Sequence, residues 1–451
     1  MEEETLNIRT PITFDESIAH CEMHAHQPYA SSTFNNSDEI RISVQHQDLC
    51  LLSSRSSLHV YGKLVKEDGS TAATNTTLIN NGIFHLFDEI RYEMNGIEID
   101  RNKNVGLTSL MKGYLSLTPG QRSLMDNAGW MQSDKLTDAA GYFDVSIPLS
   151  IILGFAEDYR KIVVNAKHEF ILTRKKSDVN AIVQSAPEEC KVVIQKLEWL
   201  IPYVKVSYRR KIELLKFVEK DAPIPMSFRT WELYEYPLLP TTSKHVWTVK
   251  TSSQLEKPGY VILGFQTGKK NNKNKNTSHF DHCNVKDVKL FLNSQCYLYG
   301  NLNLDIDRNQ FALLYEMYLN FQATYYGKEP EPILRKSDFL VYGSLIVIDC
   351  SKQNESLKFG PVDWWGEKSS IKTLRSSLCK QSTTMEFIVD VQGFKKPSDE
   401  FVLKELSVIG VGSDFSEPAT FLFQPPCSWG SLPVKYKCMN LWLQCNFHGI
   451  S

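Results

Sequence analysis

The chain has almost no net charge. Its 50 Lys and Arg residues oppose 52 Asp and Glu residues, which leaves a formal charge of −2 over 451 residues. A protein that binds nucleic acid over its whole surface carries a large positive excess, so this balance excludes that class and leaves open only a local basic patch. We therefore expect no direct nucleic acid partner.

Apolar runs long enough for a membrane helix are also missing. The most apolar stretch, residues 145–155, contains Ser and Pro and is far too short to cross a bilayer. The segment Met1–Glu4 is acidic and no apolar run follows it, so it does not have the features of a secretory signal. We expect a soluble intracellular protein of the cytoplasm or nucleus, without a membrane partner.

Signatures of enzymes are scarce. The ten cysteines form no CxxC pair, and the sequence contains no Walker-type phosphate loop, no GxSxG elbow and no HExxH helix. Isolated cysteines are typical of small core residues or surface thiols in a reducing compartment. We expect a protein that is not an enzyme and needs no cofactor.

What the chain does contain is the pattern of β-strands. Its hydrophobic content of 42% and aromatic content of 11% can support the cores of two to three domains. Helical spacing is rare and is clearest from Ser207 to Val218 and from Gln310 to Phe321. Many strands with few short helices favour a β-sandwich or jelly roll. The alternating or β-branched segments are 39–44, 57–65, 161–164, 191–197, 260–265, 288–292 and 345–348.

An internal repeat indicates two similar units. The segment 89–96 and the segment 287–294 are both alternating strands that end in an Asn-led turn, and a helical piece follows each, at 107–115 and at 311–319. Both correspondences are offset by about 200 residues, roughly the size of one sandwich with long loops. The alternative is that any two strands ending in Asn look alike, but the conserved order of strand, turn and helix favours duplication.

Proline-rich and polar stretches suggest where the units end. Pro202, Pro223 and Pro225 flank the short helix between the units, and a Ser/Lys-rich run lies near residues 370–385. The resulting division is an N-terminal arm at 1–38, a first unit at 39–205, a second unit at 206–372 and a small β-rich C-terminal fragment, an incomplete domain, at 385–451.

An ordered series of strand and loop segments is similar to a known family. The series resembles the second unit of double jelly-roll major capsid proteins of Polinton (Maverick) and adintovirus-like elements in arthropod genomes, and it extends over roughly residues 40–370. It involves no catalytic signature. In the first unit, residues 165–174 resemble a closing strand pair. The segments that carry the resemblance in the second unit are 228–237, 245–251, 255–267, 285–293 and 346–351.

The resemblance implies an all-β fold of two tandem eight-stranded jelly rolls with a few short helices. It also implies self-association, in which three chains form a homotrimeric capsomer with a pseudo-sixfold outline, possible partners being other capsid proteins. The protein would then reside in a virion-like particle. Long loops at 117–142, 269–282 and 323–339 would decorate the outside. Two alternatives stay open: a domesticated, monomeric β-sandwich binding module, and a metal-dependent enzyme that acts through the C-terminal fragment.

The densest group of metal-ligand residues lies in the arm. His20, Cys21, His24 and His26 fall within seven residues, and the two-residue spacing of His24 and His26 would place both on one face of a strand. A cupin site would need a Glu and glycines soon after an HxH pair, but Gln27-Pro28-Tyr29-Ala30-Ser31 follows. The two readings are a weak metal site and a polar surface arm.

A second group, His279, Asp281, His282 and Cys283, lies beside the lysine-rich run 269–275. Lysines interleaved with Asn and without aromatics are typical of a solvated loop, although phosphate contact stays an alternative. Large aromatic residues can anchor protein interfaces. The tryptophans considered for that role are Trp231, Trp247, Trp364 and Trp365, and the last two could instead pack over the end of the second unit.

The C-terminal fragment predicts a hairpin. Residues 385–394 form one strand that ends in a turn, and residues 401–409 form a second strand that pairs with it. Asp390 and Glu405 resemble the carboxylates on the first hairpin of ribonuclease-H-like nucleases, which hold two metal ions. The fragment also resembles a piece of another mobile-element protein.

Overall fold

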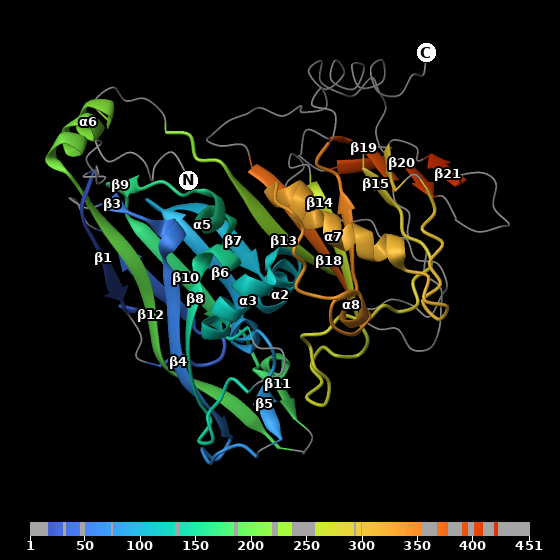
Figure 1. Cartoon of the computed structure of the whole chain (residues 1–451), viewed down its shortest axis with the longest axis horizontal. Coiled ribbons are helices and arrows are strands. Elements are labelled where there is room, and N and C mark those ends of the chain that lie inside the picture. The colour runs from blue at the N-terminus through green and yellow to red at the C-terminus, as the bar shows by residue number, and fades with distance from the viewer. Residues whose placement is uncertain are drawn as a thin grey trace, which may run out of the picture.

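A computed structural model shows a chain built mainly from β-sheets (Figure 1). We call the elements from β1 to β12 the first half and those from β13 to β18 the second half. The structure describes residues 17–29, 33–45, 50–73, 75–130, 135–184, 188–218, 224–236, 258–292, 295–298, 300–352, 368–377, 390–395, 401–408 and 419–422.

The first half contains two main sheets in which neighbouring strands are antiparallel. The larger sheet has the order β8-β4-β12-β3-β9, and β1 pairs with β12. The second sheet has the order β2-β10-β6-β7, and β5 pairs with β11 in a short third sheet. The strands are β1 (Ile18–His26), β2 (Glu39–Val44), β3 (Cys50–Leu51), β4 (Ser57–Lys66), β5 (Thr76–Leu78), β6 (Phe87–Met94), β7 (Ile97–Lys103), β8 (Tyr142–Pro148), β9 (Val163–Val164), β10 (His168–Arg174), β11 (Ile182–Gln184) and β12 (Cys190–Val206).

Alternation explains why the two main sheets form a sandwich. In β2, Ile40 and Ile42 are buried while the residues between them are partly exposed, and β4 buries Leu58 and Val60 in the same way. Asn95 has a φ of 51° and Gly96 a φ of 78°, so this pair forms the tight turn between β6 and β7. The Asn-led turn predicted after residues 89–94 is therefore confirmed.

Five α-helices and four 3₁₀ helices are described among the strands of the first half and directly after β12. Thr118 caps α3 because its side chain accepts a hydrogen bond from the backbone of Gln121, whose own side chain bonds back. The α-helices are α2 (Val105–Ser116), α3 (Pro119–Met125), α4 (Leu149–Ile152), α5 (Gly154–Asp158) and α6 (Tyr208–Val218), and the 3₁₀ helices are η1 (Ser53–Arg55), η2 (Gly82–Leu86), η3 (Asp126–Ala128) and η4 (Val179–Ala181).

The second half has a four-stranded sheet in the order β13-β18-β14-β17. In this sheet β18 runs parallel to both neighbours, β14 is antiparallel to β17, and α7 packs against β17. Its described strands number six, fewer than the eight predicted. They are β13 (Phe228–Tyr236), β14 (Pro258–Gln266), β15 (Leu290–Leu292), β16 (Gln295–Tyr297), β17 (Leu345–Asp349) and β18 (Lys368–Ser377), with helices α7 (Ala312–Tyr326) and α8 (Lys336–Tyr342).

Several predictions from the sequence can be compared with these elements. The helices expected near 107–115, 207–218 and 311–319 are confirmed as α2, α6 and α7. The expected C-terminal hairpin is confirmed too, since β19 (Asp390–Lys395) pairs antiparallel with β20 (Phe401–Val408), which also pairs with β21 (Ala419–Leu422). In the part of the chain that the structure describes, no helix is long and apolar enough to cross a membrane.

Two predicted regions differ in detail from the structure. The N-terminal arm predicted at 1–38 contains a strand, because residues 18–26 form β1, an edge strand whose side chains are mostly exposed. The region 323–339, expected to be a loop throughout, is a loop only at residues 327–335, because α7 continues to Tyr326 and α8 begins at Lys336. The predicted domain boundaries stay predictions.

Candidate functional site at the junction of the two halves

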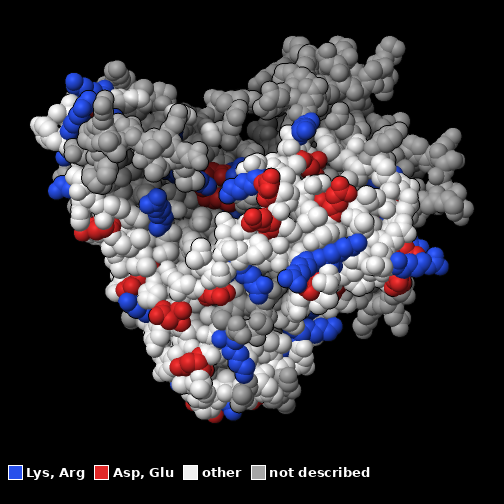
Figure 2. Space-filling model, in the orientation of Figure 1, with Lys and Arg blue, Asp and Glu red and all other residues white. Residues whose placement is uncertain are grey.

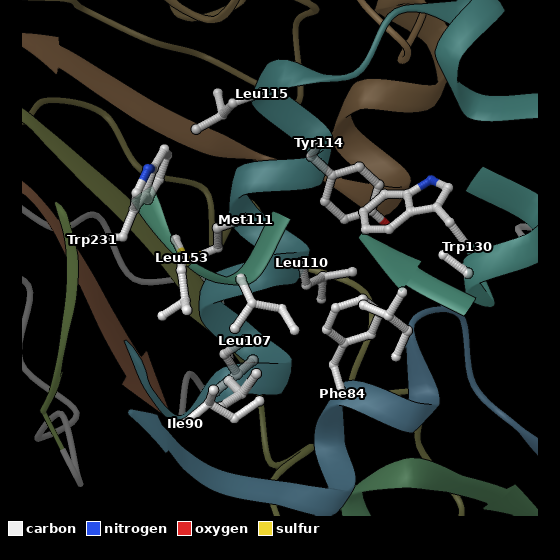
Figure 3. Close-up of a cluster of buried hydrophobic side chains, with 14 of the residues drawn as sticks. Phe84, Ile90, Leu107, Leu110, Met111, Tyr114, Leu115, Trp130, Leu153 and Trp231 are labelled. Atoms are coloured by element: carbon white, nitrogen blue, oxygen red, sulfur yellow. The ribbon is translucent and has the colours of Figure 1, made fainter. Parts of the chain in front are cut away.

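The two halves share one hydrophobic core. Helix α2 lies at the centre of the junction: Met111 and Leu115 point towards Trp231 of β13, while Leu110 and Tyr114 lie on the side of Phe84 and Trp130 (Figure 3). All of these side chains belong to one continuous buried cluster that includes both sheets of the first half and the sheet of the second. The halves therefore bury apolar surface against each other as the interior of a single domain does.

Backbone contact across the junction is close. A Cβ atom added to Gly154 in α5 would overlap the carbonyl oxygen of Arg229 in β13. Any side chain at position 154 would therefore force the two elements apart. Tyr318 in α7 donates a hydrogen bond to the carbonyl of Tyr114 at 2.9 Å, which ties a second helix to α2.

Arg229 makes the most connected polar contact of the junction. Its Nε donates to Asp158 Oδ2 at 2.8 Å, a terminal nitrogen donates to Oδ1, and the backbone N–H also donates to Oδ2 at 2.8 Å. The other terminal nitrogen donates to the carbonyl of Tyr325 at 2.7 Å, and the guanidinium lies 3.7 Å from the centre of the Tyr325 ring. Arg229 thus joins α5, β13 and α7 with a planar fork that matches a carboxylate.

The pKa values agree with a stable ion pair. Burial acts to raise the pKa of Asp158, but the hydrogen bonds and charge of Arg229 outweigh it, so the pKa lies below the usual range. Burial acts to lower the pKa of Arg229, and the hydrogen bond to Asp158 reverses this and raises it. Both groups are therefore charged throughout the neutral range.

A second ion pair lies beside the first. Lys112 in α2 contacts Glu157 Oε2 at 2.7 Å and donates to the carbonyl of Ser150 at 2.6 Å. Tyr326 in α7 donates to the other oxygen of Glu157 at 2.7 Å. Burial raises the pKa of Tyr326, so its hydroxyl stays a donor. Glu157 therefore forms an ion pair with Lys112 of the first half and accepts a hydrogen bond from Tyr326 of the second half.

The lysine-rich loop forms a third contact between the halves. Gln184 donates from its backbone to the carbonyl of Lys273 at 2.8 Å, and Thr277 donates to the carbonyl of Asn180 at 2.7 Å. Lys273 also pairs with Glu189 of the first half. The loop predicted at 269–282 is therefore bound to backbone groups and a carboxylate of the first half. Its position on the outside of an assembly stays a prediction.

The neighbouring histidine cluster does not form a ligand set. Burial, together with the charge of Lys269, lowers the pKa of His279 to about 4 against the opposing effect of Asp281. The His279 ring packs edge-on against Tyr342, and Lys269 pairs with Asp281 at 2.6 Å. Over the described ranges of the chain, no group of three or more His, Cys, Asp or Glu residues could hold a metal ion.

The structure places His24 and His26 on β1, where both contact Tyr203 of β12. The His24 ring centre lies 4.1 Å from that of Tyr203, and the Tyr203 hydroxyl lies 2.9 Å from His26 Nε2. His24 Nε2 also lies 2.7 Å from Glu22. The two-residue spacing thus brings the histidines together on one face, as expected, but around an aromatic ring.

The interface tryptophans have different outcomes. Trp231, predicted as an interface residue, is only 3% exposed and packs edge-on against Phe321 and Tyr325, so it is buried within the chain. It anchors the junction inside the chain because β13 is the strand that meets α2. The other candidates, Trp247, Trp364 and Trp365, lie outside the described residues.

Asp390 and Glu405 lie on paired strands of the C-terminal sheet. Asp390 is paired with Ser407, and Glu405 is paired with Gln392, so the two acidic residues are not direct partners. The nuclease-like reading of these carboxylates stays a prediction.

The junction residues were missed by sequence reasoning. Asp158 and Arg229 are 71 positions apart. Arg229 lies in the segment 228–237 that carries the family resemblance, but no sequence pattern links it to Asp158. The one local signal is Lys112, a charge in the apolar helix 105–116, whose side chain is only 4% exposed. A lysine in such a position needs a buried partner.

The first half has two main sheets, the second half is built on one four-stranded sheet, and the halves share a core; together they define a mainly β protein of two units. Comparison with protein families then identifies the family: the family described as "Double jelly roll-like domain" matches residues 76–376, which is more than half of the chain. The chain belongs to this family, and the predicted double jelly-roll fold class is confirmed. The match runs through both halves and the junction.

Similar solved structures include three viral capsid assemblies or proteins. The Faustovirus major capsid protein has 10% identity and a TM-score of 0.35, with 48% of this chain and 59% of that chain covered. The Sputnik virophage structure has 11% identity, a TM-score of 0.31 and coverage of 49% and 52%. The mavirus major capsid protein has 13% identity, a TM-score of 0.30 and coverage of 45% and 49%. The chain thus covers about half the length of these proteins, and no curated protein matches it.

Proposed function

We propose that this protein is a capsid-like structural subunit that self-assembles, with three chains forming one capsomer. The observation that carries the proposal is the junction, where a shared core and the Arg229–Asp158 pair fix the two jelly-roll units as one block. The double jelly-roll family supports the same role, which is not enzymatic.

Symmetry explains why such a block suits a capsomer. Three copies of two similar units fill six positions, and each unit contacts a unit of the next chain. The ring closes only if the angle between the two units is the same in every copy. A junction held by directional hydrogen bonds as well as by apolar packing supplies that constancy.

The resemblance in the strand and loop segments favours an origin in an integrated virus-like element of the Polinton type. The assembled protein would then be located in a particle, and other capsid proteins would be its partners. A net charge of −2 does not compensate a packaged nucleic acid, so packaging would require a separate basic protein.

The test is the mass of the full chain in solution, measured by light scattering at tens of micromolar. The expected species is a trimer of three times 51.6 kDa, about 155 kDa, or a larger particle visible by electron microscopy. A homogeneous 51.6 kDa monomer in low and moderate salt would contradict the proposal and favour a monomeric binding module.

A further inference from the structure

Helix α6, which links the two halves, presents an uncovered apolar face. Tyr208 is 81% exposed and Ile212 is 38% exposed, and residues four apart lie on the same side of a helix. Figure 1 shows α6 standing away from both sheets at the upper left of the molecule. Apolar side chains aligned in this way on an exposed helix favour a contact with another segment.

The same helix is strongly basic. It contains four basic residues and one acidic residue, which gives it a net charge of +3. Arg209 and Arg210 share the single carboxylate of Glu213, at 3.6 Å and 2.6 Å. Lys216 follows Arg209 by seven positions, two helical turns, and so lies on the same side, next to Ile212. Blue side chains gather at this corner of the surface in Figure 2.

The first described residues of the chain, Ser17 and Ile18, lie next to the start of α6. The backbone N–H of Ser207 donates to the carbonyl of Ser17 at 2.9 Å, and Ile18 is paired with Val206 at the end of β12. Residues 1–16, which lie outside the described residues, are therefore attached at the start of the helix. An extended segment of this length reaches about 50 Å, whereas α6 is about 16 Å long.

The composition of residues 1–16 complements the helix. Five acidic residues and one arginine give the segment a net charge of −4, opposite to the +3 of α6. It also contains four large apolar residues, Leu6, Ile8, Ile12 and Phe14. Acidic and apolar groups together are what a basic helix with an apolar face can bind.

We propose that residues 1–16 dock on α6 of the same chain. Glu2, Glu3 and Glu4 pair with the basic side chains, and the apolar residues cover Tyr208 and Ile212. The same chain is favoured because the attachment at Ser17 keeps the segment at a high local concentration. This contact does not depend on trimer formation.

The first experiment uses a mixture of ¹⁴N- and ¹⁵N-labelled full-length protein and a carbodiimide, which joins a carboxylate to a lysine amine that touches it. The expected product is an amide between Glu2, Glu3 or Glu4 and Lys216, with both peptides carrying the same label. Its yield should fall several-fold in 0.5 M salt, since salt screens exposed charges. Peptide pairs of mixed label would show that a second copy is the occupant and would overturn the same-chain proposal, as would absence of the amide.

Variants and hydrogen exchange provide a second readout. Arg209→Glu with Arg210→Glu should reduce the amide to Lys216 several-fold, whereas the matched control Arg308→Glu, another exposed arginine, should leave it unchanged. Deletion of residues 1–16 should speed amide exchange in α6 several-fold and leave α3 as it is. Unchanged exchange in α6 after the deletion would refute the docking, whatever the oligomeric state.

Discussion

Replacing Asp158 by Asn tests the junction most directly. The substitution keeps the size of the side chain but removes the charge that Arg229 meets with two side-chain nitrogens and its backbone N–H. Arg229 would keep neutral partners, namely the carbonyl and ring of Tyr325, the ring of Tyr326 and the amide oxygen at position 158. We therefore expect a cation that stays largely enclosed but loses its counter-ion.

The expected loss of stability in Asp158→Asn follows from the partial burial of both side chains. Removing one partner of a fully buried pair costs about 3–5 kcal/mol, whereas exposed pairs contribute about 0–1 kcal/mol. The Arg229 side chain is 25% exposed and that of Asp158 is 16% exposed, so the expected loss is about 2–3 kcal/mol. The matched control is Glu98→Gln, which removes a more exposed partner of Arg101 at 3.6 Å and should cost less than about 1 kcal/mol.

Urea unfolding of the full chain is the assay, followed by tryptophan fluorescence and by far-ultraviolet circular dichroism. Because both halves share one core, the two probes should report one transition in the native sequence, and Asp158→Asn should lower its midpoint or separate the probes. A midpoint equal to that of the native protein, with coincident probes, would refute the view that Arg229 needs the charge of Asp158 at this junction.

Three further predictions concern pH, packing and the loop contact. Burial lowers the pKa of His168 to about 4 from 6.5, so the folded state disfavours its protonation. The stability that the neutral ring contributes is fully present above pH 6.5 and is lost as the pH falls towards 4, and the free energy of unfolding should drop by about 2 kcal/mol between pH 7.5 and 5. In urea titrations, His168→Gln should reduce this drop. Gly154→Ala places a Cβ against Arg229 and should lower the free energy of unfolding by at least about 2 kcal/mol in thermal or urea unfolding. The control Gly259→Ala has open space around it and should cost under about 1 kcal/mol. Equal effects of the two substitutions would contradict the close contact. Lys273→Ala should speed protease cleavage within residues 267–283 while global stability changes by under about 1 kcal/mol, and unchanged cleavage would show that the Glu189 pair does not hold the loop.

The elements of the fold could be predicted because their signals are local. Alternation in residues 39–44 and helical spacing near 311–319 each fall within a few turns of chain, and β2 and α7 lie there. β1 was missed because an edge strand with exposed side chains lacks the alternation that burial imposes. Its pairing is decided by the backbone of β12, which no property of residues 18–26 reveals.

The junction could not be predicted because its signals are distant. The contact of Gly154 with Arg229 depends on how α5 meets β13, and Trp231 becomes a core residue only once that contact exists. The same tryptophan on a free sandwich face would be an interface residue, which is what the sequence suggested. Composition shows that a residue needs a partner and leaves open whether the partner is in the same chain or in the next.

The Arg229–Asp158 ion pair at this junction can fix the angle between the two halves. Apolar packing between α2 and β13 would hold the halves together, but apolar contact is non-directional and permits small rotations. The planar guanidinium of Arg229 binds both oxygens of Asp158 in one orientation. Because Gly154 has no side chain, the Arg229 backbone can lie directly against it. Buried charges are weak contributors to stability compared with apolar residues of the same volume, so we infer that this pair defines the angle between the two jelly rolls more than it strengthens their association. A capsomer closed by three chains depends on that angle in all three copies.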